Sequence, residues 1–183
     1  MSTMRGLFQA AALATAILAA PGCFNPSWPN MCFLAGTMIA TPEGEVAIEA
    51  LTIGQTVLAF DDETGKVTAG IVEKLTTSDA DDYLEVEASN GRTLAVTGEH
   101  IMAIRGTDGI EWVQADQLSV DSRLYGMTET SATDKLTIRD VRKIARSSKV
   151  YNIKVRRYHT SFANGILTHF YYDSLAEMQA HHR

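Results

Sequence analysis

The sequence predicts an all-β domain, and three observations support this prediction. Short runs rich in Val, Ile, Thr and aromatic residues recur along the chain, as is typical of strands. Turns rich in glycine and aspartate separate these runs, and two of them contain the Asn-Gly dipeptide that favours tight hairpins, at residues 90–91 and 164–165. Between residues 32 and 170, no long stretch carries apolar residues at helical spacing.

The first half of the predicted domain alternates between strands and turns. Pro42-Glu43-Gly44 supplies a turn after the first strand, and Gly54 precedes the third. The acidic, glycine-containing run at 61–66 has the composition of a hairpin loop. Residues 76–82 are mostly polar and are predicted to form a surface loop. The strands predicted in this half are 37–41, 46–51, 56–60 and 67–75.

The second half continues the same pattern. Apolar and acidic side chains alternate over 83–88, which indicates a half-buried strand. Asn90-Gly91 then reverses the chain, residues 105–109 form a further turn, and Asn164-Gly165 closes the last hairpin. The strands predicted in this half are 83–88, 93–97, 100–104, 110–113, 136–145 and 150–155, with a final hairpin over 162–167.

Length and composition predict one folded domain. The chain has 183 residues, of which 45% are hydrophobic, and this is enough for one domain with a substantial core. We assign the domain to residues 32–169 and a short linker to residues 23–31. Ser174 and Glu177 fit a capping box, so a short helix is expected within the tail at 170–183.

The charge of the chain excludes some classes of partner. The net charge is −6, from 16 basic and 22 acidic residues, without a long basic cluster or basic residues interleaved with aromatic ones. We therefore expect no nucleic-acid partner. We also expect no cofactor and no metal site, since the histidines and Cys32 do not follow a known zinc spacing.

Residues 1–22 differ in composition from the rest. A short basic start precedes an almost wholly apolar stretch at 6–20, which indicates a secretory signal and predicts a secreted or cell-envelope protein. The apolar stretch is shorter than the roughly 20 residues of a membrane-spanning helix, and it is the only part expected to meet a membrane. Cys23 follows small residues that faintly resemble a lipoprotein processing site. The alternatives are an N-terminal helix packed on the domain and a misassigned start.

Cys32, at the first position of the predicted domain, is a candidate nucleophile. A thiol there can attack the carbonyl of Met31 through a five-membered ring, which leaves a thioester and a free amine. An ordinary amide resists this reaction unless the site strains it, stabilises the oxyanion and protonates the leaving nitrogen. Met31–Cys32 is therefore the candidate scissile bond. The chain has two cysteines, so a structural disulfide between Cys23 and Cys32 is the competing interpretation.

Thr97 and His100 suit the assisting roles. Thr97 ends a predicted strand, where its hydroxyl can lie beside the strained peptide. His100 follows three residues later across a tight turn, and imidazole both takes and gives a proton near neutral pH. A Thr-x-x-His pattern alone is weak evidence, because a lone histidine is usually a surface or satisfied core residue.

Three ordered blocks resemble those of the Hint superfamily, which comprises inteins, bacterial intein-like domains and the Hedgehog autoprocessing domain. The opening block is Cys-Phe-Leu-Ala-Gly-Thr-Met-Ile-Ala-Thr-Pro-Glu-Gly at 32–44, the second is the Thr-x-x-His block at 94–100, and the third spans 150–169. The resemblance covers 32–169. It implies a compact, horseshoe-like all-β fold with pseudo-two-fold symmetry, whose two ends meet at one site of autocatalytic processing.

The C-terminal junction departs from the intein pattern. Inteins usually end in His-Asn followed by Cys, Ser or Thr, whereas His169 is followed here by Phe170 and Tyr171. Phenylalanine cannot cyclise to a succinimide and tyrosine is a poor receiving nucleophile, so full splicing is not expected. The N-terminal half of the chemistry, at Cys32, remains. On this reasoning Phe170→Ala is expected to leave cleavage unchanged.

The resemblance adds further candidate site residues. His169 corresponds to the penultimate histidine that assists C-terminal cleavage in the family, and His159 either lines the site or closes a turn. Asp79 lies in the loop where Hedgehog-type proteins place an acid that activates the acceptor. Asn152 stands where many inteins carry Asp, which weakens the branched-intermediate step. The short tail offers no separate sterol-binding region, so sterol transfer is not expected.

The sequence therefore predicts a self-processing domain that cleaves Met31–Cys32 by an N-to-S acyl shift. Its substrate is its own N-terminal flank, and the acceptor is water, a small thiol or an amine. One alternative is a catalytically silent exported Hint-fold binding or envelope module, which the short flank before Cys32 favours. A weaker alternative is a Cys/His hydrolase that acts on other molecules.

Overall fold

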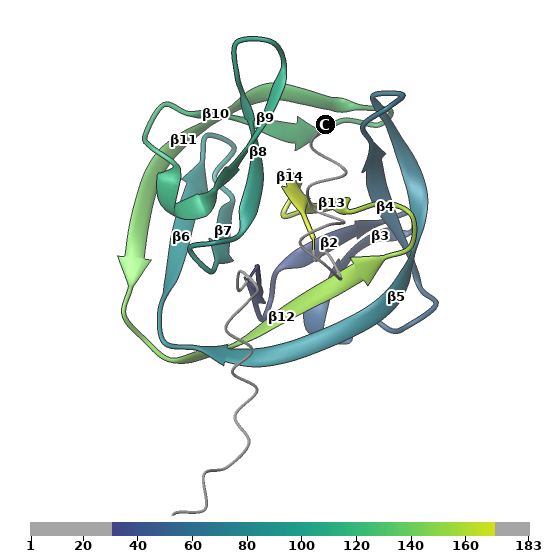
Figure 1. Cartoon of the computed structure of the whole chain (residues 1–183), viewed down its shortest axis with the longest axis horizontal. Helices are drawn as coiled ribbons and strands as arrows, with labels where there is room; N and C mark the ends of the chain where they lie inside the picture. The colour runs from purple at the N-terminus through teal and green to yellow at the C-terminus, as the bar shows by residue number, and fades with distance from the viewer. Residues whose placement is uncertain (1–30, 171–183) are drawn as a thin grey trace, which may run out of the picture.

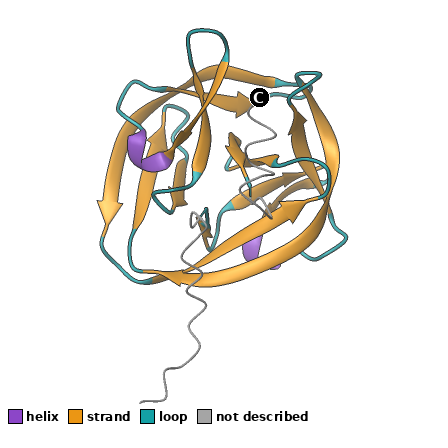
Figure 2. Cartoon of the chain, in the orientation of Figure 1, coloured by secondary structure: helices purple, strands orange, loops and turns teal. Residues whose placement is uncertain are grey.

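The computed structural model describes residues 31–170, and their regular structure is almost entirely β-strand (Figure 2). The predicted signal at 1–22, most of the linker and the predicted C-terminal helix lie outside these residues. No helix in the described part is long and apolar enough to cross a membrane. The elements are β1 (Phe33–Leu34), β2 (Met38–Thr41), β3 (Gly44–Ala47), η1 (Ile48–Ala50), β4 (Thr56–Asp61), β5 (Lys66–Ala80), β6 (Tyr83–Ala88), β7 (Thr93–Val96), β8 (Ile101–Arg105), β9 (Ile110–Gln114), η2 (Ala115–Gln117), β10 (Arg123–Met127), β11 (Ala132–Ile144), β12 (Ser148–Val155), β13 (Thr160–Ala163) and β14 (Ile166–His169).

The strands of the described part join in one open antiparallel sheet, so the all-β prediction is confirmed. Its order is β3-β2-β13-β14-β8-β10-β11-β6-β7-β1-β12-β5-β4, with β9 paired to β8. Figure 1 shows the long strands β5 and β11 curving along the outside, while β13 and β14 lie near the middle. The sheet thus curls around its own centre, and strands distant in sequence become neighbours.

The two longest strands each change partner along their length. The first part of β5 pairs with β4 and its second part with β12. In the same way, the first part of β11 pairs with β10 and its second part with β6. The register of β11 against β6 shifts between Ile138 and Asp140, which is a bulge of the kind that lets a strand bend. This repeat of one pairing pattern fits the expected pseudo-two-fold symmetry.

Two predicted elements are wrong. Residues 76–82 were expected to form a surface loop, but β5 runs on to Ala80 and pairs with β12. Residues 76–79 are polar because their side chains face solvent, while their backbone is paired within the sheet. The predicted strand at 46–51 ends at Ala47, and η1 follows. The sequence prediction also missed β1, which has only two residues, and β10, which contains a glycine.

The predicted hairpin turn at Asn164-Gly165 is confirmed and has a second role. Both residues have positive φ, 49° and 75°, as a tight turn of this kind requires. The Asn164 side chain accepts a hydrogen bond from the Met38 N–H at 2.7 Å and donates one to the Thr93 carbonyl at 2.7 Å. The turn therefore ties β2 and the start of β7 to the last hairpin.

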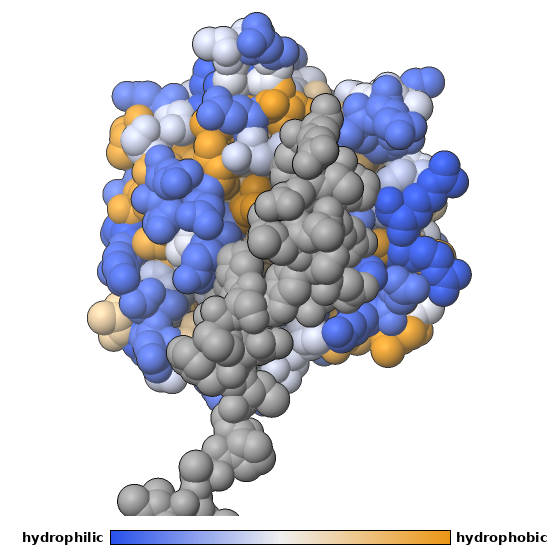
Figure 3. Space-filling model, viewed as in Figure 1, coloured by the Kyte–Doolittle hydropathy of each residue, from blue (hydrophilic) through white to orange (hydrophobic). Residues whose placement is uncertain are grey.

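The centre of the curled sheet is apolar. One large buried cluster includes Phe33, Val96, Ile153 and Phe170, and a smaller cluster surrounds Phe162. The face in Figure 3 is mostly hydrophilic, with apolar side chains in small patches. The two ends of the described chain, Met31 and Phe170, are both buried, so the core contains the ends of the domain as well as its middle.

Candidate functional site

The shortest strand places the predicted nucleophile. Cys32 immediately precedes β1, which lies between β7 and β12 and pairs with both. Phe33 is in register with Val96, the last residue of β7. Cys32 is therefore brought next to Thr97, the residue that follows β7, although 65 positions separate them in the sequence.

Thr97 holds Cys32 by hydrogen bonds on both sides. The Cys32 N–H donates to Thr97 Oγ1 at 3.0 Å, and this nitrogen belongs to the candidate scissile bond. The Thr97 N–H donates to the Cys32 carbonyl at 3.0 Å, and the Thr97 hydroxyl is 3.4 Å from the same carbonyl oxygen. With Thr97 only 3% exposed, these bonds are shielded from water. The Met31–Cys32 peptide is thus fixed at its nitrogen.

His100 lies beside this peptide without being held by hydrogen bonds to its ring. Its N–H donates to the Thr97 carbonyl at 3.1 Å across the tight turn. The ring is fully buried and packs on Phe33 with the ring centres 4.1 Å apart. Among the described residues, neither ring nitrogen has a hydrogen-bond partner of regular geometry. Burial lowers the pKa of His100 to about 3, and the nearby Met31 backbone opposes this shift.

Cys32 is a free cysteine, and the residue is 8% exposed. Its Sγ lies 4.0 Å from Oγ of Ser78 on β5. Burial raises the pKa of the thiol to about 11; the Ser78 hydrogen bond opposes the shift and the charge of Glu99 adds to it. Cys23, the other half of the alternative disulfide, lies outside the described residues. Ser78 escaped the sequence prediction because its strand was expected to be a loop.

A cleft of about 460 Å³ opens beside Thr97. Asp79 lines it, one residue from the Ser78 that contacts the thiol, so this predicted acid lies at the same site. The cleft is acidic, with five carboxylates against one lysine. Its lining residues are Ser78, Asp79, Ala80, Asp81, Asp82, Leu84, Thr97, Gly98, Glu99, Asp116 and Lys143.

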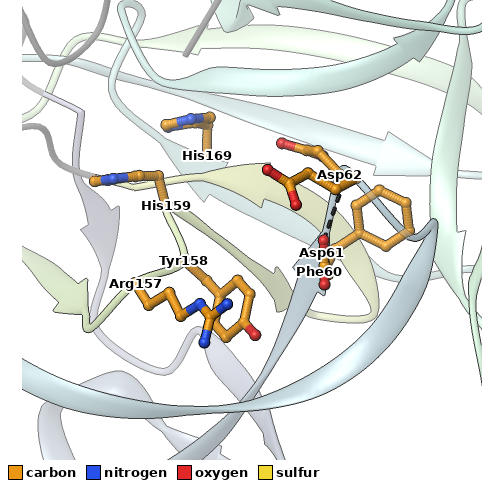
Figure 4. A pocket seen from close by; sticks show the side chains of 8 residues that line it. Phe60, Asp61, Asp62, Arg157, Tyr158, His159 and His169 are labelled. Carbon is orange, nitrogen blue, oxygen red and sulfur yellow. Dashed lines mark hydrogen bonds between the residues drawn. The ribbon is translucent and has the colours of Figure 1, made fainter. Parts of the chain in front are cut away.

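The other two predicted histidines form a separate group. The rings of His159 and His169 stack with centres 5.9 Å apart and 6° between their planes, and Trp112 packs edge-on to His169 at 5.3 Å. Both histidines line a pocket of about 200 Å³, with Asp62 and Arg157 among the other lining residues. Figure 4 shows the two rings side by side on one side of this pocket and Asp62 on the other.

Phe33 and Phe170 connect the His159–His169 pair to the site around Cys32. His169 Nδ1 is 2.7 Å from the Phe170 carbonyl oxygen, and the Phe170 N–H donates to the His159 carbonyl at 2.5 Å. The Phe170 ring then packs edge-on to Phe33 with centres 5.6 Å apart. The C-terminal group thus reaches the residue next to Cys32 through aromatic packing. Spacing in the sequence did not reveal this contact.

Asn152 lies close to the nucleophile, but its side chain is hydrogen-bonded to the neighbouring backbone. The register of β1 and β12 pairs Phe33 with Tyr151, and the next residues along it are Cys32 and Asn152. The Asn152 side chain accepts a hydrogen bond from the Ile153 N–H at 2.8 Å. Within residues 31–170, no group of three or more His, Cys, Asp or Glu side chains has the arrangement to hold a metal ion.

Comparisons with known proteins agree with the overall fold. The family model described as the pretoxin Hint domain matches residues 38–170. The solution structure of a bacterial intein-like domain from Clostridium thermocellum is 29% identical in sequence, with a TM-score of 0.67 over 75% of this chain and 97% of that one. A DnaB intein from Synechocystis sp. PCC 6803 shares the fold at 19% identity, with a TM-score of 0.68 over 77% of this chain and 99% of the intein. No curated protein matches the chain.

Proposed function

The chain belongs to the pretoxin Hint domain family, and from this premise we propose that it cleaves its own Met31–Cys32 bond through a thioester. The Hint and intein fold supports self-processing as the general function. In the specific reaction that we propose, Cys32 is the nucleophile, Thr97 fixes the leaving nitrogen and His100 acts on the Met31 carbonyl. The substrate is the segment that ends at Met31.

One observation supports this assignment above all others. The hydroxyl of Thr97 accepts the N–H of the bond to be broken at 3.0 Å, while a fully buried imidazole without a hydrogen bond of regular geometry lies by the Met31 backbone. A buried polar ring without hydrogen bonds is costly to folding. Its retention is explained if the ring makes its bonds to the reacting atoms.

The low pKa of His100 decides the form in which it acts. With a pKa of about 3, the ring is neutral near pH 7, so it begins as an N–H donor to the Met31 carbonyl rather than as an imidazolium. As Cys32 Sγ bonds to the carbonyl carbon, negative charge on the Met31 oxygen raises the pKa of the ring. The ring takes the thiol proton as this S–C bond forms, and it passes the proton to the Cys32 nitrogen as the C–N bond breaks. The products are a Met31 thioester on Sγ and a free amine.

The second step transfers the acyl group from Cys32 to an acceptor. Water, a small thiol or an amine attacks the thioester carbon, and the Cys32 thiol is released. The cleft beside Thr97 supports an acceptor path, because it borders the residues that contact Cys32. Asp79, which lines this cleft, is the candidate base for the acceptor.

The test is intact-mass spectrometry of the freshly expressed chain at pH 7.5, with and without a small thiol. We expect a product that begins at Cys32, formed faster with thiol and absent in Cys32→Ala. Thr97→Val keeps the shape of the side chain but removes the hydroxyl bonded to Cys32, and it should slow cleavage by about 10²-fold. His100→Gln should do the same. Since the thiol pKa is about 11, cleavage should also accelerate from pH 7 to pH 10.

Thr168→Val is the matched control for Thr97→Val. Thr168 is a fully buried threonine on β14 whose hydroxyl makes a 3.4 Å hydrogen bond to the Ser161 carbonyl. Its variant should cleave at the wild-type rate. Equal rates for Thr97→Val and Thr168→Val would remove Thr97 from the mechanism, and cleavage of the Cys32→Ala chain at the wild-type rate would overturn the proposal.

One observation favours a second function, that of a silent exported Hint module. Burial keeps the Cys32 thiol protonated at neutral pH, with a pKa of about 11, and this slows any attack. On this hypothesis the domain binds a partner in the cell envelope and keeps its N-terminal segment. The whole chain would then persist with thiol even at pH 10.

A further inference from the structure

Phe33, the residue after the nucleophile, contacts both the assisting histidine and the last described residue. Its ring centre lies 4.1 Å from that of His100 and 5.6 Å from that of Phe170. All three side chains are fully buried. The last described residue, Phe170, is therefore two packing contacts from the assisting histidine.

Packing contributes to holding the His100 ring in place. Its backbone is fixed, since its N–H donates to Thr97 and its carbonyl accepts from Ala115 at 2.8 Å. Its ring nitrogens, however, lack hydrogen-bond partners of regular geometry among the described residues. Ring orientation consequently depends on the side chains that press on it, and Phe33 is a close aromatic neighbour.

Phe170 in turn is firmly seated. Its N–H donates to the His159 carbonyl, and its carbonyl oxygen lies 2.7 Å from His169 Nδ1. These bonds extend the β13–β14 pairing, in which Thr160 faces His169, by one residue. The backbone bonds therefore fix the Phe170 ring against Phe33, which also packs on His100.

We propose that Phe170 is a positioning residue for cleavage at Cys32, which it assists by pressing Phe33 against His100. The inference rests on the function proposed above and replaces the expectation that Phe170→Ala has no effect. It assigns the residue at the intein asparagine position a role without chemistry of its own. It also makes cleavage depend on the last strand, so that the N-terminal bond breaks only after the domain is complete.

The test compares Phe170→Ala with Phe162→Ala as its control. Phe162 is also fully buried, but it belongs to the smaller cluster rather than to the one around Phe33. Phe170→Leu keeps a large apolar side chain at the position, so the test can still be made if Phe170→Ala fails to fold. Two readouts are taken: the cleavage rate of each folded variant, and the NMR shifts of the His100 ring protons in the Cys32→Ala background.

We expect Phe170→Ala to slow cleavage at least about tenfold and Phe170→Leu to restore part of the rate, while Phe162→Ala cleaves like wild type. The His100 ring protons should shift in both Phe170 variants, because the ring current of Phe33 acts on them, and should stay in place in Phe162→Ala. Unchanged His100 shifts in the Phe170 variants, or an equal shift in Phe162→Ala, would overturn the inference. The NMR readout needs no cleavage, so it judges this inference even if the wild-type chain proves silent.

Discussion

At the scale of single residues, the site keeps its two ionisable side chains neutral. Burial raises the pKa of Cys32 to about 11 and lowers that of His100 to about 3. Both shifts favour the uncharged form, as expected for groups removed from water beside an apolar core. Cys32 and His100 are therefore both uncharged at rest, and the proposed reaction must create charge on them in step with bond formation.

The pKa of His100 predicts an acid-labile fold. Its pKa lies below the ordinary value of 6.5, so between about pH 6.5 and pH 3 the unfolded chain binds a proton that the folded chain does not. The stability tied to this ring is complete above pH 6.5 and falls as the pH drops. Going from pH 7.5 to pH 5, this ring should lower the free energy of unfolding by about 2 kcal/mol.

Urea unfolding at the two pH values measures this effect, with Cys32→Ala as the uncleaved parent and Cys32→Ala/His100→Gln as the comparison. The parent should lose about 2 kcal/mol more than the double variant, because glutamine does not titrate. An equal loss in both chains would mean that His100 is protonated in the folded state, and would remove the neutral imidazole from the mechanism.

At the scale of elements, the two-residue strand β1 does the most to build the site. By pairing with β7 and β12 it sets Cys32 against Thr97 and Phe33 against His100. Sequence motifs identified Cys32, Thr97 and His100, since these residue types in this order suit the chemistry. They did not predict β1 itself, because a pair of residues carries no periodicity.

The contribution of β5 escaped prediction for a different reason. Its second part is polar and exposed, so the sequence resembles a loop, although the backbone pairs with β12. Ser78 and Asp79 reach the site only because this strand continues. Similarly, the contact of Phe170 with Phe33 depends on how the sheet curls, which no local pattern encodes.

The acidic cleft beside β5 predicts a charge preference for the acceptor. Five carboxylates against one lysine attract cations and repel anions. Thiols of similar size but different charge measure this directly: cysteamine should cleave the chain about tenfold faster than mercaptoethanesulfonate at low salt, with mercaptoethanol between them. The differences should shrink in high salt, because salt screens the interaction.

Two variants distinguish the effect of charge within the cleft from the effect of the net charge of the chain. Asp81→Asn removes one charge within the cleft and should narrow the spread between the thiols. Glu63→Gln removes one charge at the other pocket, near His169, and should leave the spread unchanged. The same narrowing in both variants would attribute the preference to overall charge.

At the scale of the whole molecule, the curled antiparallel sheet brings the two ends of the domain together. The repeated pairing of β5 and β11 bends the sheet, and the last hairpin crosses its centre. Phe33, next to Cys32, and Phe170 thus share one buried cluster, although they lie near opposite ends of the described chain. The three ordered motifs predicted that the ends meet. The packing that connects them could be seen only in the structure.

The central claim is that the Met31–Cys32 bond passes through a thioester, and capture with hydroxylamine tests it most directly. Hydroxylamine converts a thioester to a hydroxamate but leaves ordinary peptide bonds intact at neutral pH. We expect two fragments by mass spectrometry, one ending in a Met31 hydroxamate and one beginning with a free Cys32 amine, and no cleavage of Cys32→Ala. An uncleaved wild-type chain, or cleavage of Cys32→Ala after Met31, would contradict the thioester.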